Sequence, residues 1–247
     1  MKHIKGIVLC EGDSDMVLLG SYISQIKKST YMKQFEENPF PGEKISWYSD
    51  ESDNVIGIWD VGGNNFTPKV QKIMKREIQE HQIESVIVVT DYDDEEAAKE
   101  RPEEIYRAIN DTLKIDKYDI LSSLEQHNKW QQLYFRGGFS QRVMIRYCYL
   151  LVPYDSQGAL ETFMLTALSE KSASKKEVII QVKDFIGNFK STEYLQKRRE
   201  KIKGELSVSV AIFNPTRMFD LMNELIKQID WSVFDQTEKQ FGILKEI

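Results

Sequence analysis

Short apolar runs alternate with helix-period segments through the first hundred residues. Ile4 to Cys10 is a β-rich apolar run, and apolar residues at helical spacing follow it from Val17 to Ile26. Asn54 to Val61 predicts a second strand, and a helix is expected after Pro68 because proline suits the first helical turn. The unbroken run Ser85 to Thr90 predicts a third strand that is buried on both faces. This β-α-β-α-β order predicts an α/β fold with an open, mainly parallel sheet flanked by helices.

The remaining segments divide the chain into two parts. Lys28 to Asp53 contains two prolines and many polar residues, which predicts a long connection with a short helix near Tyr31 to Glu37. Val143 to Val152 predicts a late strand, and a helix is expected to begin near Ala159. Beyond residue 167 the pattern is mainly helical and more basic. We therefore expect an α/β domain over residues 1–166, with residues 167–247 forming a mainly helical, partly basic region packed on it.

Acidic residues follow two of the predicted strands at the point where each strand ends. Glu11 and Asp15 follow the first strand, and Asp91 and Asp93 follow the third. Ligands bind at the carboxyl ends of parallel strands, so neighbouring strands would bring these four carboxylates together. Carboxylates that close repel each other unless protons or cations are present, and oxygen ligands without His or Cys favour Mg²⁺, Mn²⁺ or Ca²⁺. The alternative is that the acids only offset the positive ends of helix dipoles. Two such clusters in one βαβαβ unit favour a metal site.

The two acidic segments resemble the Toprim domain shared by topoisomerases, bacterial primases and OLD-type nucleases. The resemblance rests on I-V-L-C-E-G-D-S-D at residues 7–15 and on V-I-V-V-T-D-Y-D-D-E at residues 86–95. The E-G-x-S-D form is most similar to stand-alone, OLD-like Toprim proteins. The resemblance covers about the first 165 residues and implies that residues 1–166 form a Toprim-like metal-binding domain.

The resemblance also implies roles for individual acids. It implies that Glu11, Asp91 and Asp93 hold Mg²⁺ (or Mn²⁺) and act on phosphodiester bonds, and that Asp15 helps to bind metal. Many Toprim proteins carry D-x-D-x-D, whereas Glu95 takes the third place here, which leaves the number of ions open. Glu161 belongs to a G-x-L-E segment similar to one in some stand-alone Toprim proteins, and it is a further candidate ligand. A first-turn glutamate at a helix start explains Glu161 equally well.

Glycine-rich and basic segments offer candidate phosphate contacts. Gly62-Gly63 follows a strand, where its N–H groups could approach a phosphate, although a tight turn is the simpler explanation. The basic stretch Lys197 to Lys203 suits the nucleic-acid backbone, with a solvated helix face as the alternative. The resemblance implies a catalytic lysine, for which Lys203 and Lys201 are candidates by placement alone. Arg136-Gly137-Gly138 with Arg142 is a weaker candidate for a backbone contact.

Composition narrows the class of protein. No apolar run approaches the roughly 20 residues that span a bilayer, and the first residues lack a signal peptide, so we expect a cytoplasmic protein without a membrane span. Cys10 and Cys148 give neither a disulfide framework nor metal-ligand spacing. The net charge of −6 argues against a general nucleic-acid coat but permits a local basic groove.

These observations predict a Mg²⁺-dependent nuclease that hydrolyses phosphodiester bonds in DNA or RNA. The resemblance to stand-alone Toprim proteins also suggests that such a nuclease acts in defence against phage or foreign DNA. One alternative is a non-catalytic, Toprim-like module that binds nucleic acid or a partner and holds a structural Mg²⁺. A receiver-like or phosphatase-like protein fits less well, because receivers need paired acids directly after the first strand. The chain lacks the G-x-x-x-x-G-K-S/T motif, so any ATPase would be a partner protein, as in OLD-type systems. Homo-oligomer formation stays open.

Overall fold

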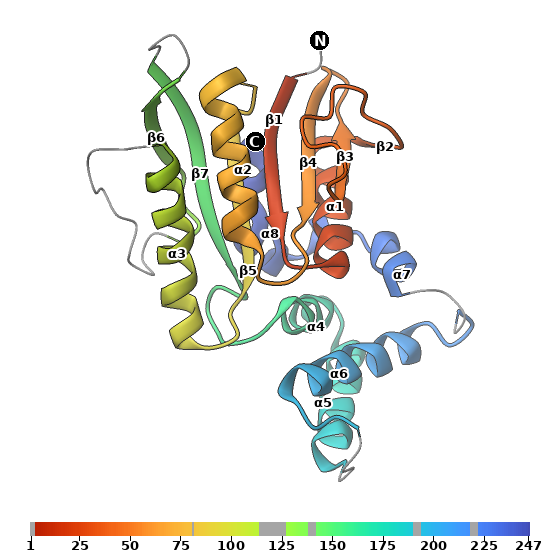
Figure 1. Ribbon diagram of the computed structural model, residues 1–247. Coiled ribbons are helices and arrows are strands. Elements are labelled where there is room, and N and C mark those ends of the chain that lie inside the picture. The colour runs from red at the N-terminus through yellow and green to blue at the C-terminus, as the bar shows by residue number, and fades with distance from the viewer. Residues whose placement is uncertain (1–2, 81, 114–126, 138–141, 190–193, 218–221) are drawn as a thin grey trace.

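A seven-stranded sheet forms the centre of the computed structural model, which describes residues 3–80, 82–113, 127–137, 142–189, 194–217 and 222–247 (Figure 1). The α/β fold predicted from the sequence is confirmed. Across the sheet the strands follow the order β2 (Thr30–Met32), β3 (Ile45–Ser49), β4 (Asn54–Asp60), β1 (His3–Cys10), β5 (Ser85–Asp91), β7 (Arg142–Val152) and β6 (Gln131–Arg136).

The four central strands run parallel, and the strands at both edges are antiparallel. β1 pairs in parallel with β4 and β5, and β5 pairs in parallel with β7. Every residue of β5 is buried, as its unbroken apolar sequence predicts. Successive residues of β1 face opposite sides, so Ile7 and Leu9 enter one hydrophobic core while Val8 and Cys10 enter the other. The parallel centre places the carboxyl ends of β1, β5 and β7 at one edge of the sheet.

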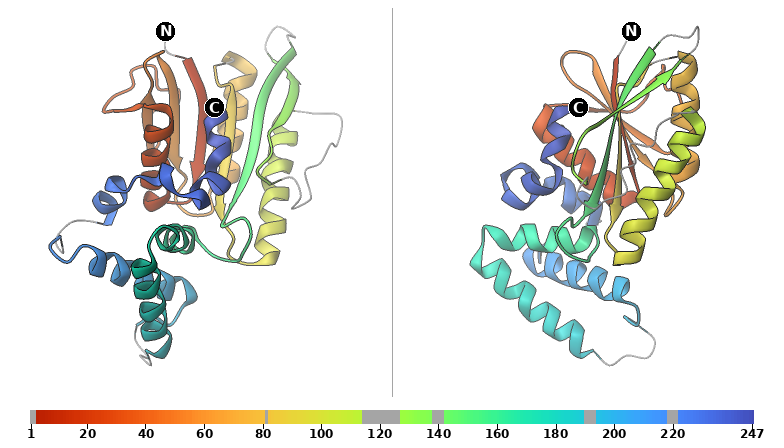
Figure 2. Two further views of the ribbon diagram at one scale, coloured as in Figure 1. Left: turned by 180° about the vertical axis from the view of Figure 1, so that it is seen from behind. Right: turned by 90° about the vertical axis from the view of Figure 1, so that its left-hand side faces the viewer.

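Helices cover both faces of the sheet (Figure 2). α2 (Phe66–Glu80) and α3 (Glu95–Leu113) pack on one face, and α1 (Asp13–Lys27) packs on the other. The predicted helix after Pro68 begins two residues before that proline, at Phe66. α1 is joined on its face by the C-terminal end of the chain, where the Phe241 ring lies 6.2 Å from the Tyr22 ring.

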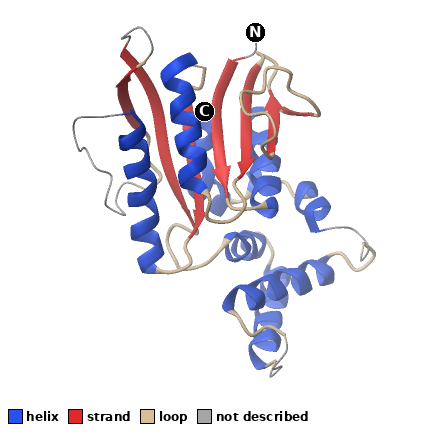
Figure 3. Ribbon diagram, viewed as in Figure 1, coloured by secondary structure: helices blue, strands red, loops and turns tan. Residues whose placement is uncertain are grey.

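The C-terminal part is helical, as expected. α4 (Leu160–Glu170) lies beneath the carboxyl ends of the strands, and α5 (Ala173–Asn188) and α6 (Arg198–Phe213) lie below α4 in this view (Figure 3). The chain then returns to the sheet through α7 (Met222–Gln228), η3 (Trp231–Val233), α8 (Asp235–Phe241) and η4 (Gly242–Glu246). No helix among the described residues is both long and apolar enough to cross a bilayer.

The segment from Lys28 to Asp53 differs from the prediction. The short helix expected near Tyr31 to Glu37 is absent from this described segment, which forms β2 and β3 instead. The alternation of side chains between the two faces of a strand explains the difference, because Trp47 is buried at the centre of β3 while its neighbours are only partly buried. Trp47 packs on Phe35 with ring centroids 4.7 Å apart, so an aromatic cluster stabilises this edge of the sheet.

Gly57 lies in the centre of β4, where the side chains of neighbouring strands leave no room for a Cβ atom. A Cβ atom there would lie 2.7 Å from Trp47 Cζ3 and 3.0 Å from Ile7 Cδ1. We expect Gly57→Ala to lower the free energy of unfolding by about 1–3 kcal/mol, because the indole ring must shift within a packed core. Gly187→Ala is the matched control, since a Cβ at this position in α5 meets nothing within 4 Å. Urea titrations that show equal stabilities for both variants would contradict this interpretation.

Candidate functional site

Two buried carboxylates lie side by side at the carboxyl ends of β1 and β5. Glu11 directly follows β1 and is 8% exposed, while Asp91 is the last residue of β5 and is 7% exposed. The backbone N–H of Asp91 donates a hydrogen bond of 3.1 Å to Glu11 Oε1, which holds the two residues together. These acids could meet only if the first and third predicted strands were neighbours, and β1 does pair with β5.

Two further acids face the same cavity from the first turns of helices. The Asp15 carboxylate in α1 accepts a hydrogen bond of 2.9 Å from the Gly12 N–H. Glu161 is in the first turn of α4 and is 8% exposed. Leu160 in the same turn donates its N–H to Asp91 Oδ1 at 3.1 Å. A cavity of about 300 Å³ is lined by Glu11, Asp15, Asp91 and Glu161, together with Gly12, Asp13, Ser14, Gly63, Arg199 and Lys203.

Crowding of the acids changes their protonation. Burial raises the pKa of Asp15 to about 8, and the charges of Asp91, Glu11 and Glu161 add to this effect. Burial also raises the pKa of Asp91 to about 7, with the Glu11 charge acting in the same direction and Arg199 opposing it. The cavity is therefore a place where negative charge is unfavourable unless a proton or a cation accompanies it.

Arginines from two helices compensate part of this charge. Arg199 Nη2 of α6 lies 3.0 Å from Glu11 Oε2 and 2.8 Å from Asp91 Oδ2, so it bridges the two buried acids. Arg101 Nη1 of α3 donates to Glu11 Oε1 at 3.0 Å. Lys203 Nζ lies 3.4 Å from Glu161 Oε1. The bridging contacts raise the pKa of the Arg199 guanidinium further above its ordinary value.

The donor atoms fit a hard divalent cation by chemical type, because carboxylate oxygens are the preferred ligands of Mg²⁺. The positions of the carboxylates, however, are those of acids that bind an arginine side chain. No group of three or more His, Cys, Asp or Glu side chains in the described part of the chain is arranged to hold a metal ion. The Arg199 guanidinium stands between Glu11 and Asp91 instead. Closing these acids around an ion therefore requires Arg199 to leave.

Two of the predicted ligands lie outside the cavity. Asp93 Oδ2 is 3.6 Å from Arg101 Nη2, and its backbone oxygen accepts a hydrogen bond of 2.6 Å from Arg198 Nη1. Glu95 is exposed in the first turn of α3. Neither residue lines the acidic cavity. The structure thus brings together Glu11, Asp15, Asp91 and Glu161 from the predicted set and leaves Asp93 and Glu95 outside it.

The candidate phosphate contacts also differ in whether they lie at the acidic cavity. Gly62 and Gly63 have φ angles of 73° and 77°, and the Gly63 N–H donates to the Glu11 backbone oxygen at 2.7 Å. The glycine pair is therefore used for the turn. Lys203 lines the cavity, and Lys201 is not among its lining residues. Arg136 and Arg142 are cross-strand neighbours in β6 and β7, at the end of the sheet opposite to the acids. Gly138 lies outside the described residues.

Sequence reasoning assigned no site role to Arg101, and it gave Arg199 a role only as part of the basic stretch Lys197 to Lys203, not as a partner of the acids. Arg101 had a detectable signal, because it shares one face of α3 with the buried residues Ala98 and Ile105. An arginine on an apolar helix face needs an acidic partner. Arg199 had no such signal within its basic run, because its partners are far away in the sequence.

Fold and site together define an α/β protein with an acidic, arginine-bridged cavity at the carboxyl ends of its parallel strands. The chain matches the family "Protein of unknown function (DUF3226)" over residues 5–245, and it belongs to that family. No curated protein matches its sequence. A similar solved structure is the crystal structure of hypothetical protein PH0156 from Pyrococcus horikoshii OT3, with 12% sequence identity and a TM-score of 0.45. That comparison covers 98% of this chain and 99% of the other.

The raised pKa values predict a stability that depends on pH. Asp15 and Asp91 keep protons in the folded protein, at pKa values of about 8 and about 7, that the unfolded chain releases near its ordinary value of 3.8. Stability is therefore lost as pH rises from about 4 to about 8. We expect Asp15→Asn to lose less stability across this range than the wild type, as measured by urea unfolding in EDTA. Asp93→Asn is the control, and identical slopes in all three proteins would contradict the assignment.

Proposed function

We propose that the protein is a Mg²⁺-dependent hydrolase of nucleic-acid phosphodiester bonds. The observation that carries the proposal is the acidic cavity, where the carboxylates of Glu11, Asp15, Asp91 and Glu161 meet two cationic side chains of α6. The likeness of residues 7–15 and 86–95 to Toprim nucleases supports the same chemistry. Either DNA or RNA is compatible with the site.

The acids of the cavity supply the ligands. Glu11 and Asp91 would hold the metal once Arg199 moves away, and Asp15 and Glu161, which line the same cavity, would add oxygen ligands or orient a bound water. A divalent ion held by these acids would supply Lewis-acid chemistry toward a phosphate group. The Gly12 N–H and the Leu160 N–H fix the carboxylates of Asp15 and Asp91, so these side chains are already oriented.

The cations of the site differ in how easily they can move. The Arg101 side chain is 14% exposed and pairs with Glu11 from within the fold, which makes it a permanent counter-charge. The Arg199 side chain is 52% exposed and the Lys203 side chain is 59% exposed, so both reach the acids from the solvent side. A metal ion that takes over the charge of Glu11 and Asp91 would free Arg199 to bind a substrate phosphate.

Loss of the central acids should abolish cleavage. We expect Glu11→Gln and Asp91→Asn each to reduce the cleavage rate by at least about 100-fold, because each removes a metal-binding oxygen. The measurement uses labelled single-stranded and double-stranded DNA and RNA with Mg²⁺ or Mn²⁺. Glu95→Gln is the matched control and should retain near wild-type activity, since Glu95 lies outside the cavity. Equal loss in the control would contradict the proposed ligand set.

Arg199 should compete with the metal. We expect Arg199→Gln to bind Mn²⁺ about tenfold more tightly than the wild type, because the guanidinium no longer occupies the two acids. Isothermal titration calorimetry measures this affinity without any substrate. Arg198→Gln serves as the control, since Arg198 donates to the Asp93 backbone oxygen and does not line the acidic cavity. Weaker Mn²⁺ binding in Arg199→Gln would show that the arginine supports the site.

One observation favours a second candidate function. The acids are paired with arginine rather than arranged around an ion, which is also what a non-catalytic Toprim-like binding module would show. Such a module would bind nucleic acid or a partner protein through the basic face of α6. Nucleic-acid binding by the wild type without cleavage, and unchanged by Glu11→Gln, would select this function. An ATPase partner is a further proposal, which co-purification would test.

A further inference from the structure

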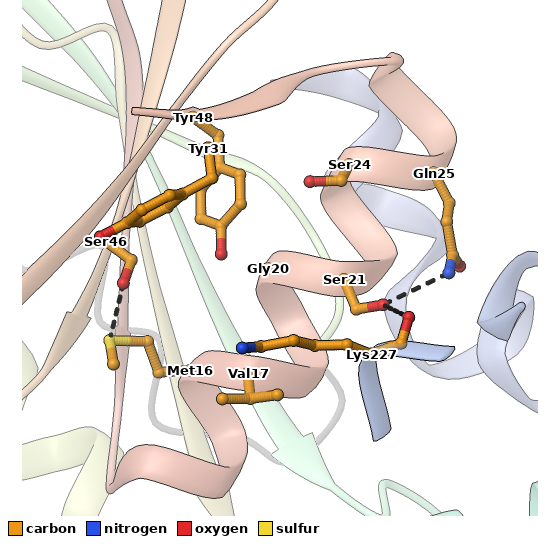
Figure 4. Close-up of a pocket in the computed structure, with 10 residues that line it drawn as sticks. All are labelled: Met16, Val17, Gly20, Ser21, Ser24, Gln25, Tyr31, Ser46, Tyr48 and Lys227. Atoms are coloured by element: carbon orange, nitrogen blue, oxygen red, sulfur yellow. Dashed lines mark hydrogen bonds between the residues drawn. The ribbon is translucent and has the colours of Figure 1, made fainter. Parts of the chain in front are cut away.

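A second cavity lies between α1, the edge strands β2 and β3, and helix α7 (Figure 4). Its volume is about 580 Å³, which is larger than the acidic cavity and within the usual range of small-molecule sites. Its apolar wall consists of Met16 and Val17 of α1 and the rings of Tyr31 and Tyr48. The proposed hydrolase chemistry uses none of these residues.

Gly20 makes room for the Tyr48 side chain, which lines this cavity. It lies within α1, where glycine costs roughly 0.5–1 kcal/mol relative to alanine. A Cβ atom at this position would collide with the hydroxyl and ring of Tyr48. The glycine therefore lets the Tyr48 hydroxyl lie against the helix backbone, at the wall of the cavity.

Donor groups point into the space beside Gly20. Figure 4 shows the hydroxyls of Tyr48 and Ser24 and the ammonium of Lys227 directed there. Neither hydroxyl has a hydrogen-bond partner among the described residues, whereas Ser21 and Gln25 bond to neighbouring protein atoms. Burial raises the pKa of Tyr48 to about 12, so its hydroxyl remains a donor at neutral pH.

The charge of the lining favours an anion. None of the lining residues is Asp or Glu, and Lys227 is the basic residue among them. Lys227 Nζ contacts Glu224 Oε1 at 2.7 Å, but both side chains are about half exposed. Such surface pairs contribute little, and the ammonium has three donors, so Lys227 can bind a ligand in addition.

The aromatic wall favours a flat ligand. Tyr31 lines the cavity and is 56% exposed, so its ring is accessible to a ligand. Its ring lies edge-to-face on Tyr48 with centroids 5.8 Å apart. A planar ring entering the cavity would cover Tyr31 and contact the Met16 thioether, which packs well against aromatic groups.

We propose that this cavity binds a small planar aromatic molecule that carries one anionic group. The ring lies among Met16, Tyr31 and Tyr48, and the anion accepts hydrogen bonds from Lys227 and from the free hydroxyls. Aromatic carboxylates and nucleoside monophosphates share this chemistry. This site is separate from the acidic cavity and does not depend on the proposed hydrolase activity.

Calorimetric titration with two anionic probes and their uncharged counterparts tests the proposal. The probes are indole-3-carboxylate and adenosine 5′-monophosphate, compared with indole and adenosine, all in EDTA. We expect at least one anion to bind about tenfold more tightly than its uncharged counterpart, because a charge-assisted hydrogen bond is lost in the latter. The tighter anion identifies the source, either an aromatic acid or a nucleotide. Absence of binding by both anions up to millimolar concentration would overturn the proposal.

Variants locate the binding. Lys227→Gln and Tyr48→Phe should each lower the affinity for the anion by about tenfold. Lys239→Gln makes the same charge change on an exposed surface outside the cavity and should leave binding unchanged. Amide chemical shifts of Gly20 and Ser24 should move on binding in the wild type. Affinity that survives both cavity variants, or that falls equally in the control, would place the ligand elsewhere and overturn the assignment.

Discussion

The charge balance around Glu11 and Asp91 is the constraint on which the rest of the structure depends. Both carboxylates are buried at neighbouring strand ends, and burying a charge without a partner costs on the order of several kcal/mol. Compensation comes from Arg101 on α3 and Arg199 on α6. These two helices lie on different sides of the strand ends, and the acids bind both. The position of α6, far along the chain, is thus tied to the first strand.

This constraint explains why the helical C-terminal part belongs to the site. α4 delivers Glu161 and the N–H of Leu160, and α6 delivers Arg199 and Lys203. The later helices are held to the sheet by burial, since Trp231 and other residues of this part share a core with α1. Lys27 and Arg146 add hydrogen bonds to backbone oxygens at the C-terminal end. The strand ends therefore supply Glu11 and Asp91, the helix starts supply Asp15 and Glu161, and the C-terminal part supplies much of the opposing charge.

Sequence periodicity predicted the parallel centre of the sheet and its strand-end acids, because both follow from local patterns. The unbroken run of β5 and the acids after it are examples, and Glu11 and Asp91 do lie together. It missed β2 and β3, which are short and depend on packing of Trp47 against Phe35. It could not separate Asp15 from Asp93 as cavity residues, since side-chain direction depends on the helix that follows. The pairing of Arg199 with residues 188 and 108 positions away is a tertiary contact with no local signal.

α1 serves both cavities with different faces, which keeps their chemistry separate. Asp15 points from its first turn toward the acids, while Gly20 and Ser24, one turn apart, line the second cavity. The buried residues Leu19 and Ile23 lie between these faces and hold the helix to the sheet. Because the core fixes the helix, a side chain can change in one cavity without moving the other. The same packing requires glycine at position 20, where the helix backbone meets a tyrosine hydroxyl from the sheet edge.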